Sequence, residues 1–298
     1  MSAFDAYLPR QRERVDAALA AYFPADTPHP HRLVEAVRYS LLGGGKRIRP
    51  IVLLAACEAV GGDTARALPF ACAVEMIHAY SLIHDDLPSM DDDDLRRGRP
   101  TSHVVFGEGL AILAGDALLS EAFHLLARTA ERDPRPRRAL RAMNEIAEAA
   151  GIHGMVGGQA ADIAAQGSGT DLAMVEFIHV RKTGALLLAA VRAGALLGGA
   201  HAPTLKALTR YGERLGLVFQ IADDILGAEA PASLTGKETG RDDILNKATF
   251  PAVIGLPAAK QRARELLEQA LAALNRFDAQ ADPLRDIVRF VVGRACAP

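Results

Sequence analysis

The chain has 298 residues, of which 50% are apolar and 5% aromatic, and tryptophan is absent. This length suffices to bury a sizeable core, and the scarcity of aromatic residues favours closely packed helices over a β-rich fold. The formal net charge of −2 leaves no overall basic field to attract nucleic acid, so we expect no nucleic-acid partner.

The first helix is predicted over residues 3–22 and the second over residues 31–42, where a run of three glycines ends it. The cations Lys46, Arg47 and Arg49 follow, before an apolar helix over residues 51–60. Three cations between a glycine turn and a helix start can bind an anion. A basic loop of this kind is more often simply solvated.

The helix predicted over residues 67–86 leads into the densest chemistry of the chain. Six aspartates fall between Asp85 and Asp94, and three arginines follow directly. Such carboxylates repel one another unless a cation lies among them, and arginines beside a carboxylate-bound metal suggest a polyanionic ligand. An acidic loop followed by a basic one can also be merely solvated.

The geometry around this run can be anticipated in part. Pro88 breaks the helix, so Asp91 can fold back towards Asp85. His78 shares a helix face with Asp85 and looks towards the acidic run, although a lone histidine on an apolar helix is more often a core residue.

Further helices are predicted over residues 105–132 and 137–150, and Thr170 is a candidate N-cap for a helix starting near Asp171. Lys182 lies in an apolar stretch, where a cation needs a partner, so it is a better functional candidate than a surface lysine. Residues 183–200 are the most apolar part of the chain. They are interrupted by Arg192 and rich in glycine, which predicts a buried helix with no membrane insertion.

A long helix over residues 203–226 ends in a second acidic patch. Gln220, Asp223 and Asp224 share one face of it. Residues 228–247 have no periodicity and are long enough to form a lid or binding loop. Helices follow over residues 251–256, 258–276 and 283–295. Without a repeat or a linker, the sequence predicts a single domain over residues 1–298.

Three cysteines, Cys57, Cys72 and Cys296, have no metal-ligand spacing and indicate a reducing compartment. Since the first residues do not look like a signal peptide, we expect a soluble, cytoplasmic protein. If its two acidic helix ends face each other across a cavity, they can hold several Mg²⁺ ions, and nearby cations can surround diphosphates. An apolar cavity below them would suit a prenyl chain.

From about residue 31 the chain resembles the trans-isoprenyl diphosphate synthases, most closely the bacterial short-chain farnesyl diphosphate synthases. The resemblance rests on an ordered series of motifs: residues 44–50, 77–86 continuing through Asp91 to residues 96–98, Gly158-Gln159 with Asp162, Lys182-Thr183, Phe219-Gln220 with Asp223-Asp224, and Gly236-Lys237 with Asp242, Lys247 and residues 249–251. Each motif is weak alone, but together, in this order and at these intervals, they are specific.

The resemblance implies an all-α, single-domain helical bundle of the isoprenoid synthase type, with a deep central cavity and usually a homodimer. It implies Mg²⁺-dependent head-to-tail condensation of isopentenyl diphosphate with dimethylallyl and geranyl diphosphates to give farnesyl diphosphate. Geranylgeranyl and geranyl diphosphates are alternative products. More remote alternatives are a terpene cyclase, which would not need an isopentenyl pocket, and an inactive partner subunit of a heteromeric synthase.

The resemblance also implies roles for individual residues. Asp85, Asp91 and Asp223 would hold three Mg²⁺ ions, with Asp86 and Asp224 supporting. The allylic diphosphate would contact Lys237 and the four catalytic candidates Arg96, Lys182, Thr183 and Gln220. Isopentenyl diphosphate would contact Lys46, Arg49, His78 and Arg97.

Two further positions bear on product and activity. Tyr80, followed by Ser81, lies five residues before Asp85, about 7.5 Å along the helix axis, where family members with short products place bulk. Gly227 stands where the family usually has a third aspartate of the second patch. Its loss weakens the expected third metal site, for which water, Asp224 or Glu229 could substitute.

Overall fold

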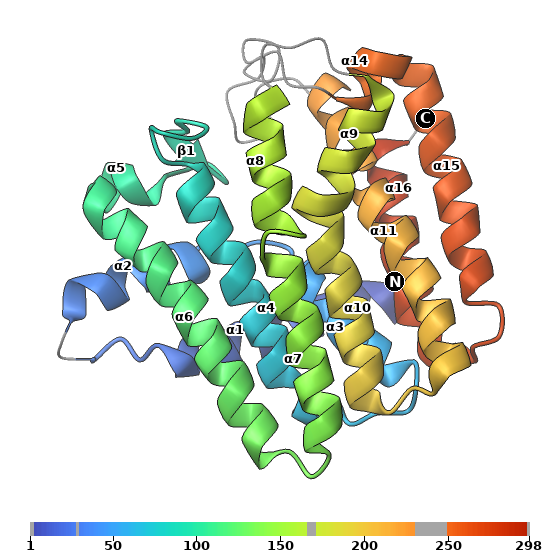
Figure 1. Cartoon of the computed structure of the whole chain (residues 1–298), viewed down its shortest axis with the longest axis horizontal. Coiled ribbons are helices and arrows are strands. Elements are labelled where there is room, and N and C mark those ends of the chain that lie inside the picture. The colour runs from blue at the N-terminus through green and yellow to red at the C-terminus, as the bar shows by residue number, and fades with distance from the viewer. Residues whose placement is uncertain (1–2, 28–29, 166–170, 230–248, 297–298) are drawn as a thin grey trace. The chain divides into compact units, whose positions relative to one another are not determined.

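The computed structural model describes residues 3–27, 30–165, 171–229 and 249–296, and it is built almost entirely of helices (Figure 1). The all-α fold predicted from the sequence is therefore confirmed. The helices are α1 (Ala3–Tyr22), α2 (His31–Leu41), α3 (Ile48–Glu58), α4 (Thr64–Asp85), α5 (Ser102–Phe106), α6 (Glu108–Arg132), α7 (Pro136–Ala150), α8 (Met155–Ala165), α9 (Leu172–His179), the π-helix η1 (Val180–Gly184), α10 (Ala185–Gly198), α11 (Ala202–Glu229), α14 (Phe250–Ile254), α15 (Leu256–Ala273), the 3₁₀ helix η2 (Ala279–Ala281) and α16 (Asp282–Ala295).

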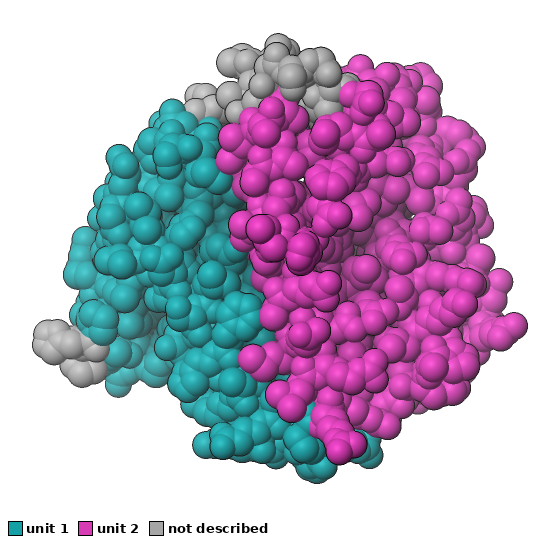
Figure 2. Space-filling model, in the orientation of Figure 1, with its two compact units in different colours: residues 1–51, 68–136 teal, residues 52–67, 137–298 magenta. Residues whose placement is uncertain are grey.

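The chain divides into two compact units, drawn in teal and magenta in Figure 2. Unit 1 comprises residues 1–51 and 68–136, and unit 2 comprises residues 52–67 and 137–298. The division falls inside α3, inside α4 and at Pro136, where α7 begins; only the last of these boundaries lies at a proline-rich turn. The single domain over residues 1–298 stays a prediction.

In unit 1, α6 packs against α2 and α5. The C-terminal end of α4 also approaches α6 closely. His84 Nε2 lies 3.1 Å from the carbonyl oxygen of Ile112, and a Cβ added at Gly115 would lie 2.2 Å from the same nitrogen. A glycine at position 115 therefore allows α6 to accommodate the end of the helix that carries the first aspartates.

In unit 2, α11 packs against α10, α15 and α16. Tyr211 of α11 is fully buried, and its hydroxyl donates a 2.7 Å hydrogen bond to the carbonyl oxygen of Leu284. Most of α10 is buried, as predicted for the apolar stretch. Arg192, which interrupts that stretch, pairs with both carboxylate oxygens of Glu145 at 2.7 and 2.6 Å.

Most predicted helices lie within a few residues of the observed ones, and two differences have local causes. The helix predicted over residues 105–132 is split into α5 and α6 by Gly107, whose φ is +86°. The N-cap prediction at Thr170 is wrong. Asp171 is the N-cap of α9, because its carboxylate accepts a 2.9 Å hydrogen bond from the amide of Met174.

A small hairpin, which no sequence pattern predicts, is formed by β1 (Leu95–Arg96) and β2 (Arg99–Pro100), the only strands in the described part of the chain. The strands are antiparallel, with Arg96 opposite Arg99. The two turn residues, Arg97 and Gly98, both have positive φ (+55° and +73°), as a type I′ turn requires. The hairpin therefore fixes the backbone directions of all three arginines that follow the aspartates.

Among the described residues, two helices, α4 and α6, are long and apolar enough to cross a membrane by length and composition alone. The most apolar segment of α4 is 67% buried inside the structure, and that of α6 is 39% buried. Because the core helices of water-soluble proteins pass the same test, this is weak evidence for a membrane span. The expected absence of membrane insertion stays a prediction.

Close helix packing in unit 2 gives a stability test at Gly194. A Cβ there would lie 2.0 Å from the carbonyl oxygen of Leu53, so we expect Gly194→Ala to lower the free energy of unfolding by about 2 kcal/mol or more. Gly293 of α16 has nothing within 4 Å of an added Cβ, and Gly293→Ala should leave stability unchanged or raise it by about 0.5–1 kcal/mol. Urea denaturation of both variants checks this, and equal effects would contradict it.

Candidate active site

The chain folds back after α4, as the sequence predicts. The amide of Asp91 donates to the carbonyl oxygen of Asp85 at 2.9 Å, and that of Asp93 donates to the carbonyl oxygen of Asp86 at 3.2 Å. The backbone hydrogen bond places Asp91 beside Asp85, although six positions separate them.

The two aspartates at the end of α4 have different environments. Asp86 is buried, and both its carboxylate oxygens accept 2.8 Å hydrogen bonds from Nε of Arg96, while a third bond, from Nη2, measures 2.5 Å. Asp85 and Asp91 are only partly buried. Burial alone would lower the pKa of Arg96, but the hydrogen bonds and charge of Asp86 raise it overall. Asp86 therefore holds the guanidinium of Arg96 in place.

The second arginine of the hairpin contacts the glycine turn before α3. Arg97 Nη1 donates to the carbonyl oxygen of Gly44, and a Cβ at Gly45 would lie 2.8 Å from the guanidinium carbon. The glycines at 44 and 45 have φ of +92° and +124°. The turn therefore needs glycine both for its conformation and, at residue 45, for the approach of Arg97. Lys46, which follows, is exposed.

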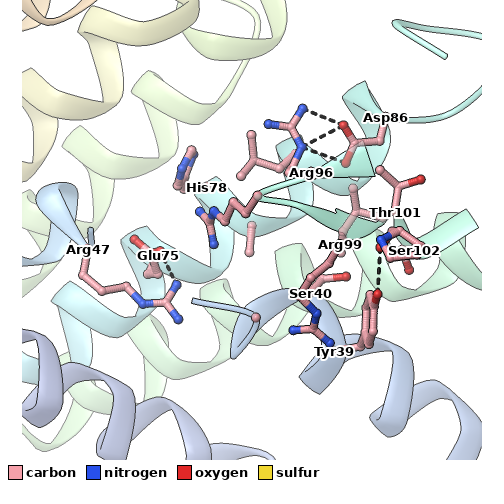
Figure 3. A pocket seen from close by; sticks show the side chains of 16 residues that line it. Tyr39, Ser40, Arg47, Glu75, His78, Asp86, Arg96, Arg99, Thr101 and Ser102 are labelled. Atoms are coloured by element: carbon pink, nitrogen blue, oxygen red, sulfur yellow. Dashed lines mark hydrogen bonds and ion pairs between the residues drawn. The ribbon is translucent and has the colours of Figure 1, made fainter. Parts of the chain in front are cut away.

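These elements surround a pocket in unit 1, which Figure 3 shows from close by. The hairpin contributes the positively charged residues Arg96, Arg97 and Arg99 to its lining. His78 of α4 and Asp86, which follows α4, also line it. His78 Nε2 lies 3.3 Å from Nη1 of Arg49. Since a guanidinium only donates, this nitrogen of His78 is the acceptor and the ring is neutral in this contact.

The charge state of His78 follows from its surroundings. Burial lowers the pKa of His78 well below its usual value, and the charges of Arg49, Arg97, Arg96 and Arg47 lower it further. The ring therefore stays neutral at pH 7. It can take part in hydrogen bonding at the pocket without adding a charge.

Tyr80 and Ser81 lie one turn before the aspartates on α4. Tyr80 is buried, and its ring meets the His84 ring edge-on with 5.7 Å between centroids. Ser81 Oγ donates to the carbonyl oxygen of His78 at 2.9 Å. The bulky ring of Tyr80 is thus held in one orientation, while the hydroxyl of Ser81 hydrogen-bonds to its own helix.

In unit 2, Lys182 and Thr183 lie in the π-helix η1, a rare form of helix that is frequent at functional sites. Lys182 Nζ pairs with Asp162 Oδ2 of α8 at 2.5 Å, which supplies the partner that a cation in this stretch needs. A Cβ at Gly158 would lie 2.2 Å from the amide nitrogen of Lys182, so glycine at that position allows α8 to approach η1.

A chain of hydrogen bonds joins η1 to the second acidic patch. Thr183 Oγ1 donates to Gln220 Oε1 at 2.8 Å, and Gln220 Nε2 donates to Asp224 Oδ1 at 3.0 Å. The other carboxylate oxygen of Asp224 accepts from the amide of Phe250 at 3.0 Å. Asp223, in contrast, is exposed. Each acidic patch therefore has one aspartate bound into the protein, Asp86 or Asp224, and a more exposed neighbour.

The remaining site predictions have mixed outcomes in the structure. Gly227 lies within α11, and Glu229, suggested above as a substitute metal ligand, has Oε1 2.6 Å from Nζ of Lys260. This ion pair competes with any metal for Glu229. Lys237, together with the predicted loop residues Asp242 and Lys247, lies outside the described residues.

Sequence reasoning missed two sets of residues that the structure brings to these sites. One is Glu75, which is buried and contacts Arg47 at the pocket. A carboxylate inside an apolar helix is the same signal that singled out Lys182, and it was available. The other is His179, whose buried Nδ1 has no hydrogen-bond partner and whose ring stacks on Phe250 with 5.3 Å between centroids.

Within the described residues, no group of three or more histidine, cysteine, aspartate or glutamate side chains forms a metal site by itself. Each unit instead gathers polar groups that are suited to an anion. Unit 1 presents arginines beside two partly exposed aspartates. Unit 2 presents Lys182, paired with Asp162, and Thr183, joined through Gln220 to Asp224.

Comparison with known proteins gives concordant matches. Residues 30–289 match the model of the polyprenyl synthetase family. The chain is 47% identical to farnesyl diphosphate synthase of Geobacillus stearothermophilus, covering 97% of both chains. It is 46% identical to chloroplastic geranylgeranyl pyrophosphate synthase 11 of Arabidopsis thaliana, covering 98% of this chain and 83% of that one. A geranyltransferase from Helicobacter pylori, solved in complex with magnesium and isoprenyl diphosphate, superposes with a TM-score of 0.85 at 29% identity, covering 98% of both chains.

Fold, site and relatives together define an all-α prenyltransferase, an enzyme that transfers alkyl groups. The chain belongs to the polyprenyl synthetase family. The resemblance inferred from the sequence motifs is thus confirmed.

His179 gives a stability prediction that depends on pH. Burial is the main cause that lowers the pKa of His179 to about 4, against about 6.5 in an unfolded chain. Between these values the unfolded chain binds a proton that the folded protein does not. The free energy of unfolding should therefore fall as pH drops through this window, by up to about 3 kcal/mol from this group.

Urea denaturation between pH 7 and pH 4.5 measures this dependence. The variant His179→Gln should lose part of the slope, whereas His201→Gln, at an exposed histidine, should keep the slope of the unaltered protein. Identical slopes for all three proteins would contradict the role assigned to His179.

Proposed function

We propose that the protein is a short-chain isoprenyl diphosphate synthase that condenses isopentenyl diphosphate head-to-tail with dimethylallyl and then geranyl diphosphate, giving farnesyl diphosphate. The observation that carries this is the unit 1 pocket, where Arg96, Arg97 and His78 lie beside the turn that brings Asp91 back to Asp85. A terpene cyclase would have no use for a second, isopentenyl-binding set of cations.

The substrate contacts divide between two sets of residues. Lys46, Arg49, His78 and Arg97 bind isopentenyl diphosphate. The allylic diphosphate contacts Arg96, Lys182, Thr183, Gln220 and Lys237. The orientation of Arg96 by Asp86 supports these roles, because a guanidinium held in place is a good donor to phosphate oxygens. A neutral His78 ring adds one N–H donor.

Three Mg²⁺ ions complete the site, held by Asp85, Asp91 and Asp223, with Asp86 and Asp224 supporting. Mg²⁺ is commonly held by one or two carboxylates, with phosphate oxygens and water as its other ligands, so the partly exposed aspartates of each patch fit it. When bound, the ions stabilise negative charge that develops on the leaving diphosphate. The relative from Helicobacter pylori was solved with magnesium and isoprenyl diphosphate, which supports this proposal.

The protein side chains have two tasks in the reaction. The cations around the diphosphate stabilise the charge that appears as the allylic C–O bond breaks. The site must also exclude water, which would otherwise trap the carbocation before the isopentenyl double bond attacks it. No side chain stands out as the base that removes the last proton. We therefore assign this task to the departing diphosphate.

The replacement of the usual third aspartate by Gly227 leaves the Asp223 metal site with fewer protein ligands. Asp224 is already engaged with Gln220 and Phe250, and Glu229 with Lys260. Water is therefore the ligand that we assign to the open position. The second candidate function is that of an inactive partner subunit in a heteromeric synthase, and Gly227 is the feature that favours it.

We further propose that the enzyme is a cytoplasmic homodimer. The α5 and α6 helices of unit 1 carry exposed apolar side chains, among them Val104, Ile112 and Leu113, the last 54% exposed. Exposed apolar residues clustered on neighbouring helices are typical of subunit contacts, and this supports the dimer.

Condensation activity tests the proposed function directly. The purified protein, given Mg²⁺, isopentenyl diphosphate and dimethylallyl diphosphate, should yield a C15 diphosphate identified by mass. Asp85→Asn should lower kcat by about a thousandfold, because it removes a metal-binding charge that acts in the transition state. Asp92→Asn, at an exposed aspartate of the same turn, is the matched control and should change kcat less than threefold.

The outcomes separate the alternatives. A C20 or C10 product would replace farnesyl diphosphate with one of the other chain lengths, and a hydrocarbon from an allylic substrate alone would indicate a cyclase. No product from the protein by itself would leave the partner-subunit role as the surviving candidate.

Tyr80 is proposed to end the cavity after a C15 product. Tyr80→Ala should shift the product distribution to C20 and longer chains, because it removes a ring that is buried and held against His84. Tyr80→Phe keeps the bulk and should keep the C15 product. The lengths are measured by mass spectrometry of the dephosphorylated alcohols, and an unchanged distribution in Tyr80→Ala would rule the ring out as the floor.

A further inference from the structure

Arg47 is the one cation of the segment 46–49 to which the proposed function gives no task. Lys46 before it is exposed and Arg49 after it is partly exposed, but Arg47 is 3% exposed. A buried arginine needs partners for its charge and for its five N–H groups.

The partners of Arg47 come from three separate helices of unit 1. Its Nη1 donates to Glu75 Oε1 of α4 at 2.6 Å, and its Nε donates to Asp16 Oδ1 of α1 at 2.7 Å. Its Nη2 donates to the carbonyl oxygen of Leu41, the last residue of α2, at 2.7 Å. The guanidinium therefore ties the loop to three elements at once.

The backbone of Arg47 is equally constrained. Its φ is +52°, in the left-handed region that a residue with a Cβ rarely adopts. Its carbonyl oxygen accepts the hydrogen bond from the amide of Ile51 at 3.1 Å, which begins α3. The inward side chain and the left-handed backbone together leave its neighbours Lys46 and Arg49 outside the buried network.

The buried pair also affects the charge of the pocket. Arg47 and Glu75 both line it, and Figure 3 shows them joined on the same side of the pocket as His78. Glu75 precedes His78 by three residues on α4 and has a side chain only 3% exposed. An unpaired carboxylate there would repel an anionic ligand in surroundings that screen charge poorly.

Both carboxylates that line the pocket are paired with an arginine. Glu75 is paired with Arg47, and Asp86 is paired with Arg96. This pairing leaves the positive charge of Arg97 and Arg99 in excess, so the pocket favours an anion overall.

We propose that Arg47 is a positioning residue for isopentenyl diphosphate. It neutralises Glu75 at the pocket and fixes the loop that presents Lys46 and Arg49 to that substrate. The inference rests on the proposed function, because it takes isopentenyl diphosphate as the ligand of this pocket. Arg47 would touch neither substrate, and it would affect the binding of isopentenyl diphosphate only.

The test is steady-state kinetics with each substrate varied in turn. Arg47→Met should raise the KM for isopentenyl diphosphate roughly tenfold, because Glu75 is left unpaired, while the KM for geranyl diphosphate changes less than about twofold. Glu75→Gln keeps the shape and an acceptor for Arg47 but removes the negative charge. It should leave the isopentenyl KM unchanged or lower it. A merely structural role would make both variants worse for both substrates.

Two further variants keep the test decisive. Arg192→Met breaks the Arg192–Glu145 ion pair in unit 2 and should lower stability without changing the isopentenyl KM. If Arg47→Met does not fold, as judged by circular dichroism, Asp16→Asn is tested in its place. Asp16 is the more exposed of the two acidic partners of Arg47. This substitution should raise the isopentenyl KM by roughly twofold to fivefold, again without affecting geranyl diphosphate.

The outcomes distinguish this inference from the proposed function. Absence of any condensation by the unaltered protein would overturn the proposed function and this inference with it. An active enzyme in which a folded Arg47→Met, or Asp16→Asn in its place, changes both KM values equally or neither would overturn the positioning role alone.

Discussion

The pairing of buried carboxylates is the constraint on which the arrangement of the site depends. Burying a carboxylate costs free energy unless a hydrogen-bonded partner compensates it. Glu75 is paired with Arg47, Asp86 with Arg96, and Asp224 with the amide groups of Gln220 and Phe250. Each pairing fixes a side chain or backbone segment next to a more exposed polar group. The paired acids thereby determine where the more exposed aspartates and the arginines beside them can lie.

This pattern explains why the aspartates come in pairs along α4 and α11. The first of each pair, Asp85 or Asp223, is partly or fully exposed, and the second is held inside. Adjacent positions on a helix point about 100° apart, so one residue can face outward while its neighbour faces the protein. Each pair thus combines an exposed carboxylate with one that is bound into the protein.

Much of the helical fold was predictable, because apolar periodicity and glycine or proline breaks mark most helix ends. The fold-back of Asp91 also followed from Pro88 alone. The hairpin at residues 95–100 did not, since two-residue strands have no periodicity and a type I′ turn is expected at Asn-Gly rather than Arg-Gly. The partners of Arg47 were equally hidden. Asp16 and Glu75 lie 31 and 28 positions from it, and only the folded chain brings them together.

Within the described residues, the three non-glycine residues with positive φ are Arg47, Asp92 and Arg97. Two of them line the pocket and the third belongs to the acidic turn beside it. Asparagine or glycine would adopt these conformations more readily, so each position gives up some folding stability to keep a charge. At the two pocket positions, Arg47 and Arg97, selection for a more stable protein and selection for an active one therefore oppose each other. Selection for thermal stability alone would favour the replacement of these two arginines.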